Sequence, residues 1–456
     1  MKKKYVRWTL WTIASPFILF IILCILIYLP PIQNFLVDKA AVYASEATGM
    51  NISVGRISLS FPLNLVVTNV DAASPHNDTL LSVRRLQVNV QLLPLLKKQV
   101  EVDGISLQGA TVNSNDLIHG MKLNGTLGEL FISSHGVALD PETAIVNKVL
   151  LKDTDLSLCL NDTAAADTAA SDTAYWKIIL QDIDLQNVSF ALDMPLDSLS
   201  LAASLDNAIL RDGLIDLHKS AYSLQTFRIK NGRVRYDSGK PLAADSLPSG
   251  LDPSHIALTD IGVKLDSLYY GGRNMKAIIS QFVLKERSGV EIVSATGRMV
   301  SNDKVLRVPS LKLETRDSYL ELNAAMDWNA LDFKDEGLVS ARLMADIGKP
   351  DMVRFMGSMD EKFIRQYPSE PLRIRTGIDG DLNKLKLTTL TAELPGALGL
   401  FARGELTHLT DSLLRGGDIT LEAETKDLKF VSTLAEGIEI PYGTRLEGKF
   451  TMAGTK

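Results

Sequence analysis

Apolar and polar residues alternate with a period of two along most of this chain, from Asn51 onward. Leu86, Val88, Val90 and Leu92 show the pattern clearly, because single polar residues separate them. Neighbouring side chains of a strand point to opposite faces, so each such segment predicts a strand with one apolar face and one wet face. Alternation that returns without intervening helical periods predicts a fold that is mainly β, with a largely antiparallel sheet.

A short internal repeat accompanies the alternation. Each copy has an alternating apolar pair, then a dipeptide rich in Gly, Asn or Asp, then another alternating stretch; the copies are 105–112, 149–156, 183–190 and 227–234. Gly, Asn and Asp favour turns and bulges, so we expect each dipeptide to interrupt the pattern locally. The repeat predicts an array whose units cover one another's apolar faces, and the alternative is a chance similarity among hairpins.

The N-terminus predicts a membrane anchor. Three lysines and Arg7 form a basic tail over 1–7, and the next segment, 8–30, carries no charge. At about 1.5 Å per residue, a helix over 8–30 is long enough to cross a bilayer. The positive-inside rule places the tail in the cytoplasm and the rest of the chain beyond the membrane. A cleavable signal peptide is the alternative, but its apolar region is shorter and ends at small residues, unlike Pro30-Pro31.

Three other segments depart from the strand pattern. Residues 31–49 have apolar residues at helical spacing and end at Gly49, which predicts an amphipathic helix. Residues 161–174 are small and polar, which predicts a flexible linker between a β region over 50–160 and a continuing β region over 175–456. A helical insertion near 351–367 is expected to cross or cap the sheet. Because alternation continues to the end of the chain, we expect it to be truncated from a longer protein.

No sequence motif indicates catalysis or a bound cofactor. Phosphate loops, nucleophile elbows, zinc-protease helices and paired Cys-x-x-Cys ligands are absent from the sequence. The two cysteines offer no disulfide framework, and the six histidines lie far apart. A formal net charge of -6 gives no basic footprint for nucleic acid. We therefore predict a protein that is not an enzyme and has no catalytic residues, metal site, cofactor or nucleic-acid partner.

The linker contains repeated Asp-Thr-Ala triplets. They resemble an O-glycosylation motif used by some Gram-negative bacteria, and the candidate acceptors are Thr163, Thr168 and Thr173. The alternative is a low-complexity linker without sugar.

The order of these features resembles the N-terminal part of the TamB and AsmA-like envelope proteins. The resemblance rests on the basic tail, the anchor and the short helix, followed by the segments 49–57, 80–88, 92–96 and 102–109. In the last two, a Leu-Leu-Pro-Leu-Leu turn precedes a strand with the pattern Ile-x-Leu-x-Gly. The resemblance is clearest over residues 1–115 and continues only as repeat character to the end of the chain.

The resemblance implies a periplasmic protein anchored in the inner membrane, whose elongated antiparallel sheet curls into a long groove with an apolar interior and carries few helices. It implies a function in cell-envelope biogenesis, in which phospholipid is conducted toward the outer membrane. It also implies an outer-membrane barrel partner of the Omp85 type, which would contact a C-terminal region that this chain does not contain.

The residues themselves point to a groove as well. A sheet with one apolar face must be covered by another layer, curl on itself or offer that face to a ligand. The groove-lining candidates for phospholipid acyl chains are Leu86, Val88, Val90, Leu92, Ile105 and Leu107. The alternative is an ordinary closed core. Two other functions fit the pattern: a translocation and assembly factor for outer-membrane proteins and secretion, and a non-catalytic envelope scaffold.

Overall fold

The computed structural model describes residues 39, 41, 42, 45, 46, 48–60, 64–74, 79–91, 102–114, 120–138, 142–161, 176–239, 250–334, 337–357, 360–433 and 441–452. The chain is mainly β and contains few helices. It divides into two compact units. Unit 1 comprises residues 1–174 and 178–196, and unit 2 comprises residues 175–177 and 197–456.

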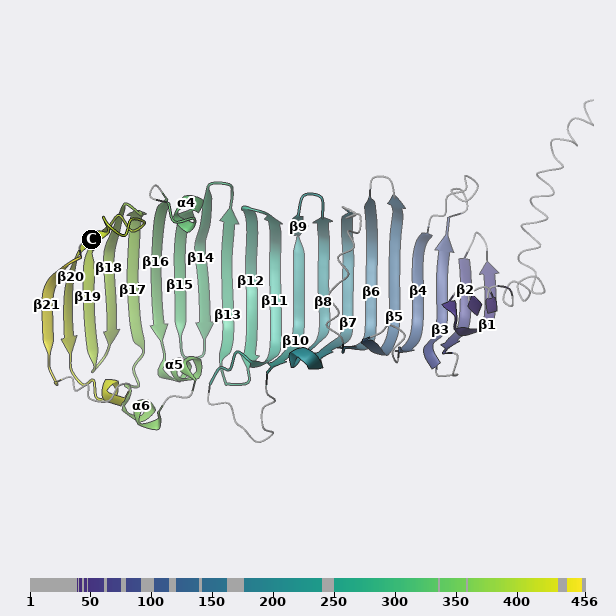
Figure 1. Ribbon diagram of the computed structural model, residues 1–456, viewed down its shortest axis with the longest axis horizontal. Helices are drawn as coiled ribbons and strands as arrows, with labels where there is room; N and C mark the ends of the chain where they lie inside the picture. The colour runs from purple at the N-terminus through teal and green to yellow at the C-terminus, as the bar shows by residue number, and fades with distance from the viewer. Residues whose placement is uncertain are drawn as a thin grey trace, which may run out of the picture. The chain divides into compact units, whose positions relative to one another are not determined.

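Unit 1 contains a meander of antiparallel strands. In chain order these are β1 (Asn51–Ser60), β2 (Asn64–Ala73), β3 (Thr79–Val90), β4 (Val102–Asn113), β5 (Met121–Ala138), β6 (Thr143–Leu160) and β7 (Lys177–Met194). Strands β1 to β5 each pair with the next strand along the chain (Figure 1). Strand β7 lies beside β6, because Asn147 donates a hydrogen bond to Gln181 and Asn187 donates one to Asp153, each at 2.9 Å.

Unit 2 contains a longer meander of the same kind. Its strands are β8 (Leu199–Asp216), β9 (Ala221–Leu224), β10 (Thr226–Ser238), β11 (His255–Gly271), β12 (Asn274–Glu286), β13 (Glu291–Ser301), β14 (Val305–Thr315), β15 (Tyr319–Asp327), β16 (Leu338–Ile347), β17 (Leu372–Asp381), β18 (Lys384–Leu394), β19 (Leu398–Thr407), β20 (Gly416–Thr425) and β21 (Arg445–Met452). Strands β9 and β10 are two halves of one interrupted strand, since both pair with β8 on one side and β11 on the other. From β10 onward, each strand pairs with its successor.

The helices whose bounds the structure describes are short. They are α4 (Trp328–Leu331), α5 (Lys349–Met356), α6 (Glu361–Gln366) and the 3-10 turns η1 (Pro195–Asp197) and η2 (Val431–Thr433). The sequence predicts one helix near 351–367, where the structure has two. Gly357 ends α5 in the left-handed region at φ 71°, and the Asp360 side chain caps α6 by accepting a hydrogen bond from the Lys362 amide at 2.7 Å.

Two packed clusters form the hydrophobic core of unit 2, and both lie at strand ends. One holds Phe363, Tyr367, Leu394, Ala397, Leu428 and Phe430, with the α5 residue Met352 against it. The other holds Ala330, Val339 and Leu382. Figure 1 shows α4 at one end of the strands β15 and β16 and the helices α5 and α6 at the other end.

Several predicted segments lie wholly or largely outside the described residues. These are the tail 1–7, the anchor 8–30 and most of the linker 161–174 with its three threonines. The described residues of the predicted helix over 31–49 are helical up to Thr48, and Gly49, at φ 69°, donates a hydrogen bond to the Ser45 carbonyl at 2.9 Å. Within the described ranges, no helix combines the length and the apolar character that a membrane crossing needs.

Candidate functional site: the apolar face of the sheet

Strand pairing in unit 1 collects apolar side chains into rows that cross the sheet. Directly opposed residues of antiparallel strands lie on the same face. One row consists of Ile57, Val67, Leu86, Leu107, Leu130 and Leu151. The next row consists of Leu59, Leu65, Val88, Ile105, Ile132 and Val149. We call the face that carries these rows the apolar face of unit 1.

The apolar face continues past a point where the alternation changes phase. In each of the strands β1 to β5, two consecutive apolar positions are three residues apart at this point, as in the steps Val83 to Leu86 and Leu107 to Ala110. Beyond the step, a third row consists of Val54, Val70, Val83, Ala110 and Leu127. The register of β3 with β4 is unchanged across the step, so neighbouring strands change phase together. Without this shared step, the apolar residues beyond it would point to the opposite face.

A line of unusual backbone conformations marks the step, and we call it the crease. Asn69, Gly109, Asp153 and Asn187 have φ values of 53°, 61°, 49° and 51° in the left-handed region. Asn, Asp and Gly tolerate this conformation best, which explains the composition of the repeated dipeptides. The crease leaves two consecutive residues on the polar side of each strand and none on the apolar side. Because the polar side becomes the longer one, we expect each strand to bend toward its apolar side.

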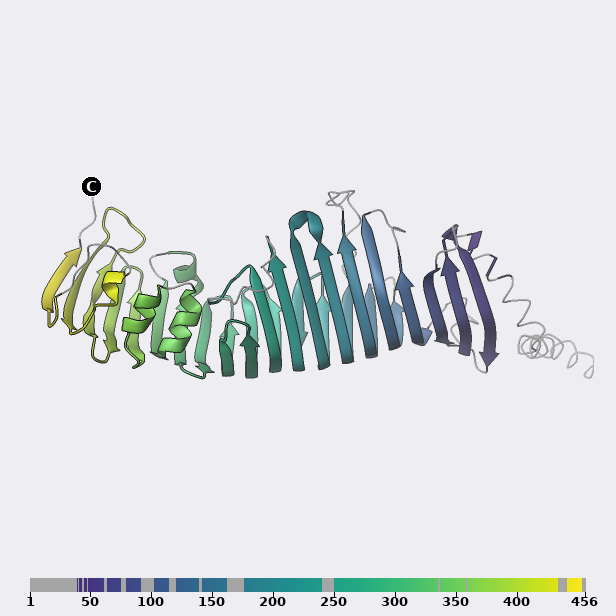
Figure 2. The same cartoon turned by 90° about the horizontal axis from the view of Figure 1, so that it is seen from below.

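Figure 2 shows the strands of each unit in a view turned by 90° from that of Figure 1. The predicted interruption at each repeated dipeptide is confirmed for all four copies, since Gly109, Asp153, Asn187 and Asn231 each lie inside a strand with positive φ.

Gly128 on β5 allows the close approach of strands at the crease. A Cβ atom at this position would lie 2.9 Å from the carbonyl oxygens of both Lys152 and Asp153 on β6. Gly128→Ala should therefore push backbone against backbone, and we expect it to lower the free energy of unfolding by about 2 kcal/mol. Chemical denaturation followed by amide hydrogen exchange in unit 1 measures the effect.

Gly399→Ala on β19 is the matched control, because a Cβ atom there would meet nothing within 4 Å. Its φ lies outside the left-handed region, as that of Gly128 does. We expect little change in stability for this variant. Similar stabilities of the two variants would contradict the close approach at the crease.

The apolar face of unit 1 has no covering layer among the described residues. Every member of the first two rows keeps part of its surface accessible, and Ile105 is 36% exposed. The buried hydrophobic side chains in the described part of unit 1 are Ala72, Leu80 and Val83. Partly exposed rows of this length contrast with the interior of a closed core, where side chains interdigitate with few voids.

Unit 2 has an apolar face with the same construction. Its crease separates Leu205 from Ala208 on β8, Ile229 from Gly232 on β10 and Ile279 from Phe282 on β12. Ion pairs lie on the polar side beside it, at 3.3 Å between Arg233 and Asp206 and 2.7 Å between Lys285 and Asp260. Strand β15 alternates without a step, and its pairing with β16 has no irregularity, so the crease ends there.

The structure brings together most of the predicted groove residues. Leu86 lies opposite Leu107, and Val88 lies opposite Ile105, all on the apolar face. Val90 continues the alternation on β3, and Leu92 lies outside the described residues. Sequence reasoning missed that Gly55, Arg84 and Gly128 belong to the crease. Their residue types do not mark them, since glycine and arginine occur at many other positions, and only the strand register places them opposite left-handed residues.

The described residues offer no cluster suited to metal binding: none of them form a group of three or more His, Cys, Asp or Glu side chains that could hold an ion. The predicted absence of catalysis stays a prediction. No protein-family model matches the chain, and a search of curated proteins finds no relative.

Proposed function

We propose that the creased sheet of each unit curls into a groove and that its apolar face binds the acyl chains of phospholipids. The observation that carries this proposal is the set of apolar rows in unit 1, over which the described residues form no second layer. The bend toward the apolar side gives the face a concave form, which suits a long and thin apolar ligand.

The energetics favour an acyl chain as the occupant. Each buried methylene contributes about 0.8 kcal/mol, so even part of one chain gives measurable binding. The rows of Leu, Ile and Val offer no polar group that would fix a chain at one position. A lipid held in this way keeps the freedom to slide along the rows, which a conduit requires.

In the same proposal, residues 8–30 anchor the protein in the inner membrane, with the N-terminus in the cytoplasm and the body in the periplasm. Phospholipid then moves along the apolar face toward the outer membrane, as the resemblance to TamB and AsmA-like proteins implies. The protein contributes to envelope biogenesis as a carrier without catalysis or cofactors. An outer-membrane barrel of the Omp85 type is a partner in this proposal.

Photocrosslinking in cells tests the proposal. A photoreactive residue is placed in turn at positions 86 to 90, and the attached molecules are identified by mass spectrometry. We expect lipid adducts at Leu86, Val88 and Val90 and none at Gln87 or Asn89. The last two are suitable controls, because Gln87 donates a hydrogen bond to Asn89 at 3.1 Å on the polar side of the same strand.

Lipid adducts at all five positions would indicate nonspecific contact with a membrane and would contradict a groove. Adducts to outer-membrane proteins at the apolar positions would favour an assembly factor. An absence of adducts at those positions would favour a scaffold.

A further inference from the structure

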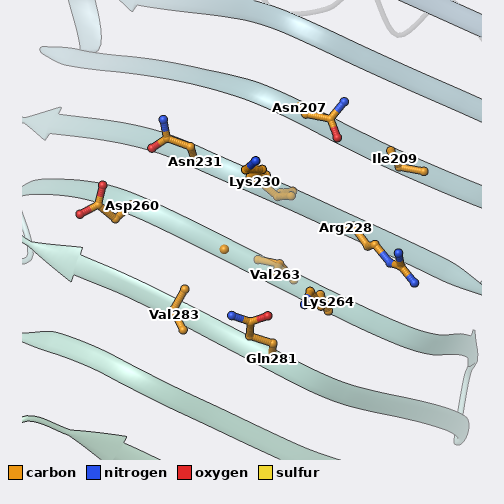
Figure 3. A pocket seen from close by; sticks show the side chains of 12 residues that line it. Asn207, Ile209, Arg228, Lys230, Asn231, Asp260, Val263, Lys264, Gln281 and Val283 are labelled. Atoms are coloured by element: carbon orange, nitrogen blue, oxygen red, sulfur yellow. The ribbon is translucent and has the colours of Figure 1, made fainter.

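The polar face of unit 2 contains a second candidate site, on the side of the sheet opposite its apolar rows. A depression of about 500 Å³ lies over Gly262 on β11. Figure 3 shows side chains from four neighbouring strands around it. The side chains that surround it on the polar face include Ile209, Arg228, Lys230, Lys264, Gln281 and Val283.

Register places these side chains in two short rows. Ile209, Arg228, Lys264 and Gln281 are directly opposed across β8, β10, β11 and β12. In the adjacent row, Val283 lies opposite Gly262. Because glycine has no side chain, the space above Gly262 stays empty and forms the bottom of the depression. A Cβ atom at Gly262 would come within 2.8 Å of a Val283 methyl group, so a larger residue would crowd the depression.

Within the described part of the chain, no acidic side chain compensates the cations around the depression. Arg228 and Lys264 face each other directly, at a typical Cβ separation of about 5 Å. Like charges in such a pair destabilise a sheet. Among the residues that the structure describes, neither of them forms an ion pair, and neither does Lys230. The arrangement therefore costs stability unless an anion lies between the cations.

The one carboxylate of the depression does not neutralise these cations. Asp260 accepts a hydrogen bond from Lys285 at 2.7 Å, and this bond raises the pKa of Lys285. Lys285 in turn lies 3.9 Å from Glu291, which also pairs with Arg316. Asp260 thus belongs to a neighbouring charge network.

We propose that this depression binds a phosphate group. Arg and Lys together supply charge and several donors to phosphate oxygens, and the Gln281 amide can add another donor. The volume leaves room for a substituent, and Ile209 and Val283 give it an apolar wall. The ligand class is therefore a phosphate ester, either a soluble one or the headgroup of a phospholipid. The site does not depend on acyl-chain binding on the other face.

Calorimetric titration of the full chain tests the site with three probes: inorganic phosphate, glycerol 3-phosphate and dihexanoylphosphatidylglycerol below its micelle concentration. Arg228→Gln and Lys264→Gln should each weaken binding about tenfold. Arg298→Gln is the matched control, since Arg298 is an exposed cation on the polar side of β13, outside the depression. We expect it to leave binding unchanged.

The probes separate the two ligand sources. Equal affinity for glycerol 3-phosphate and the short-chain lipid, with both weakened by Lys264→Gln, identifies a soluble phosphate ester. Lipid binding at least tenfold tighter, with the same dependence on Lys264, identifies a headgroup. The proposal is overturned if no probe shows binding that depends on Arg228 and Lys264, or if Arg298→Gln has an equal effect. If crosslinking finds no lipid adduct at Leu86, that result contradicts lipid binding on the apolar face and leaves the phosphate site unaffected.

Discussion

Asp351→Ala is expected to lower the free energy of unfolding of unit 2 by about 3 kcal/mol. Asp351 lies on α5 and is only 1% exposed. Its carboxylate accepts hydrogen bonds from the hydroxyls of Thr315 and Ser318, the latter at 2.7 Å, and pairs with Arg354 at 3.1 Å. Removing the carboxylate takes an acceptor from both hydroxyls, of which that of Thr315 keeps the more distant Ser318 carbonyl at 3.3 Å, and takes one partner from the guanidinium.

These bonds attach α5 to the turn between β14 and β15, so the variant should also loosen the helix. We expect faster hydrogen exchange at amides of residues 349–356, where Met352 packs against the cluster at the strand ends. Glu361→Ala on α6 is the control, because Glu361 is 79% exposed and pairs with Arg365 in an i,i+4 arrangement on the surface. Its expected cost is about 0.5 kcal/mol or less. Unchanged exchange over α5 in Asp351→Ala would contradict the anchoring role.

Much of the strand structure could be predicted from the sequence, because one-sided alternation leaves few other solutions. Leu86 and Val88 lie on the same face of β3, as their spacing predicts. The repeated dipeptides also carried a correct signal, since Asp153 and Asn187 adopt left-handed conformations inside strands. Each left-handed residue changes the backbone of its own strand, but the crease extends across several strands. A crease forms only when several strands change phase along one line, and a single strand does not reveal that line.

Other features depend on contacts that no local pattern contains. The spacing of apolar residues near 351–367 fits one helix, whereas Gly357 and Asp360 divide it in two. The polar depression was missed because Arg228 and Lys264 are far apart in the sequence. Their opposition follows from the pairing of β10 with β11. The alternation in the sequence places both residues on the solvent-exposed face, where charged residues are expected in any case, so it gave no indication of a binding site.

Leu86→Asp is expected to reduce lipid bound to the protein about a hundredfold. Leu86 lies between Val67 and Leu107 in the first apolar row, so a carboxylate there faces the path of an acyl chain. A carboxylate surrounded by hydrocarbon costs about 3 kcal/mol, which corresponds to about two orders of magnitude in affinity. Mass spectrometry of phospholipid extracted from purified full-length protein measures the loss.

Gln87→Asp is the matched control, one residue along the same strand. The side chain of Gln87 accepts a hydrogen bond from Arg85 at 3.2 Å on the polar side, where a new carboxylate meets a cation and water. Both variants should keep their fold, because the apolar face is partly exposed and an unliganded carboxylate at position 86 can be hydrated. Hydrogen exchange over β2 to β4 checks this. Equal lipid content in the two variants would exclude the apolar face as the lipid path, since the two differ only in the face that receives the charge.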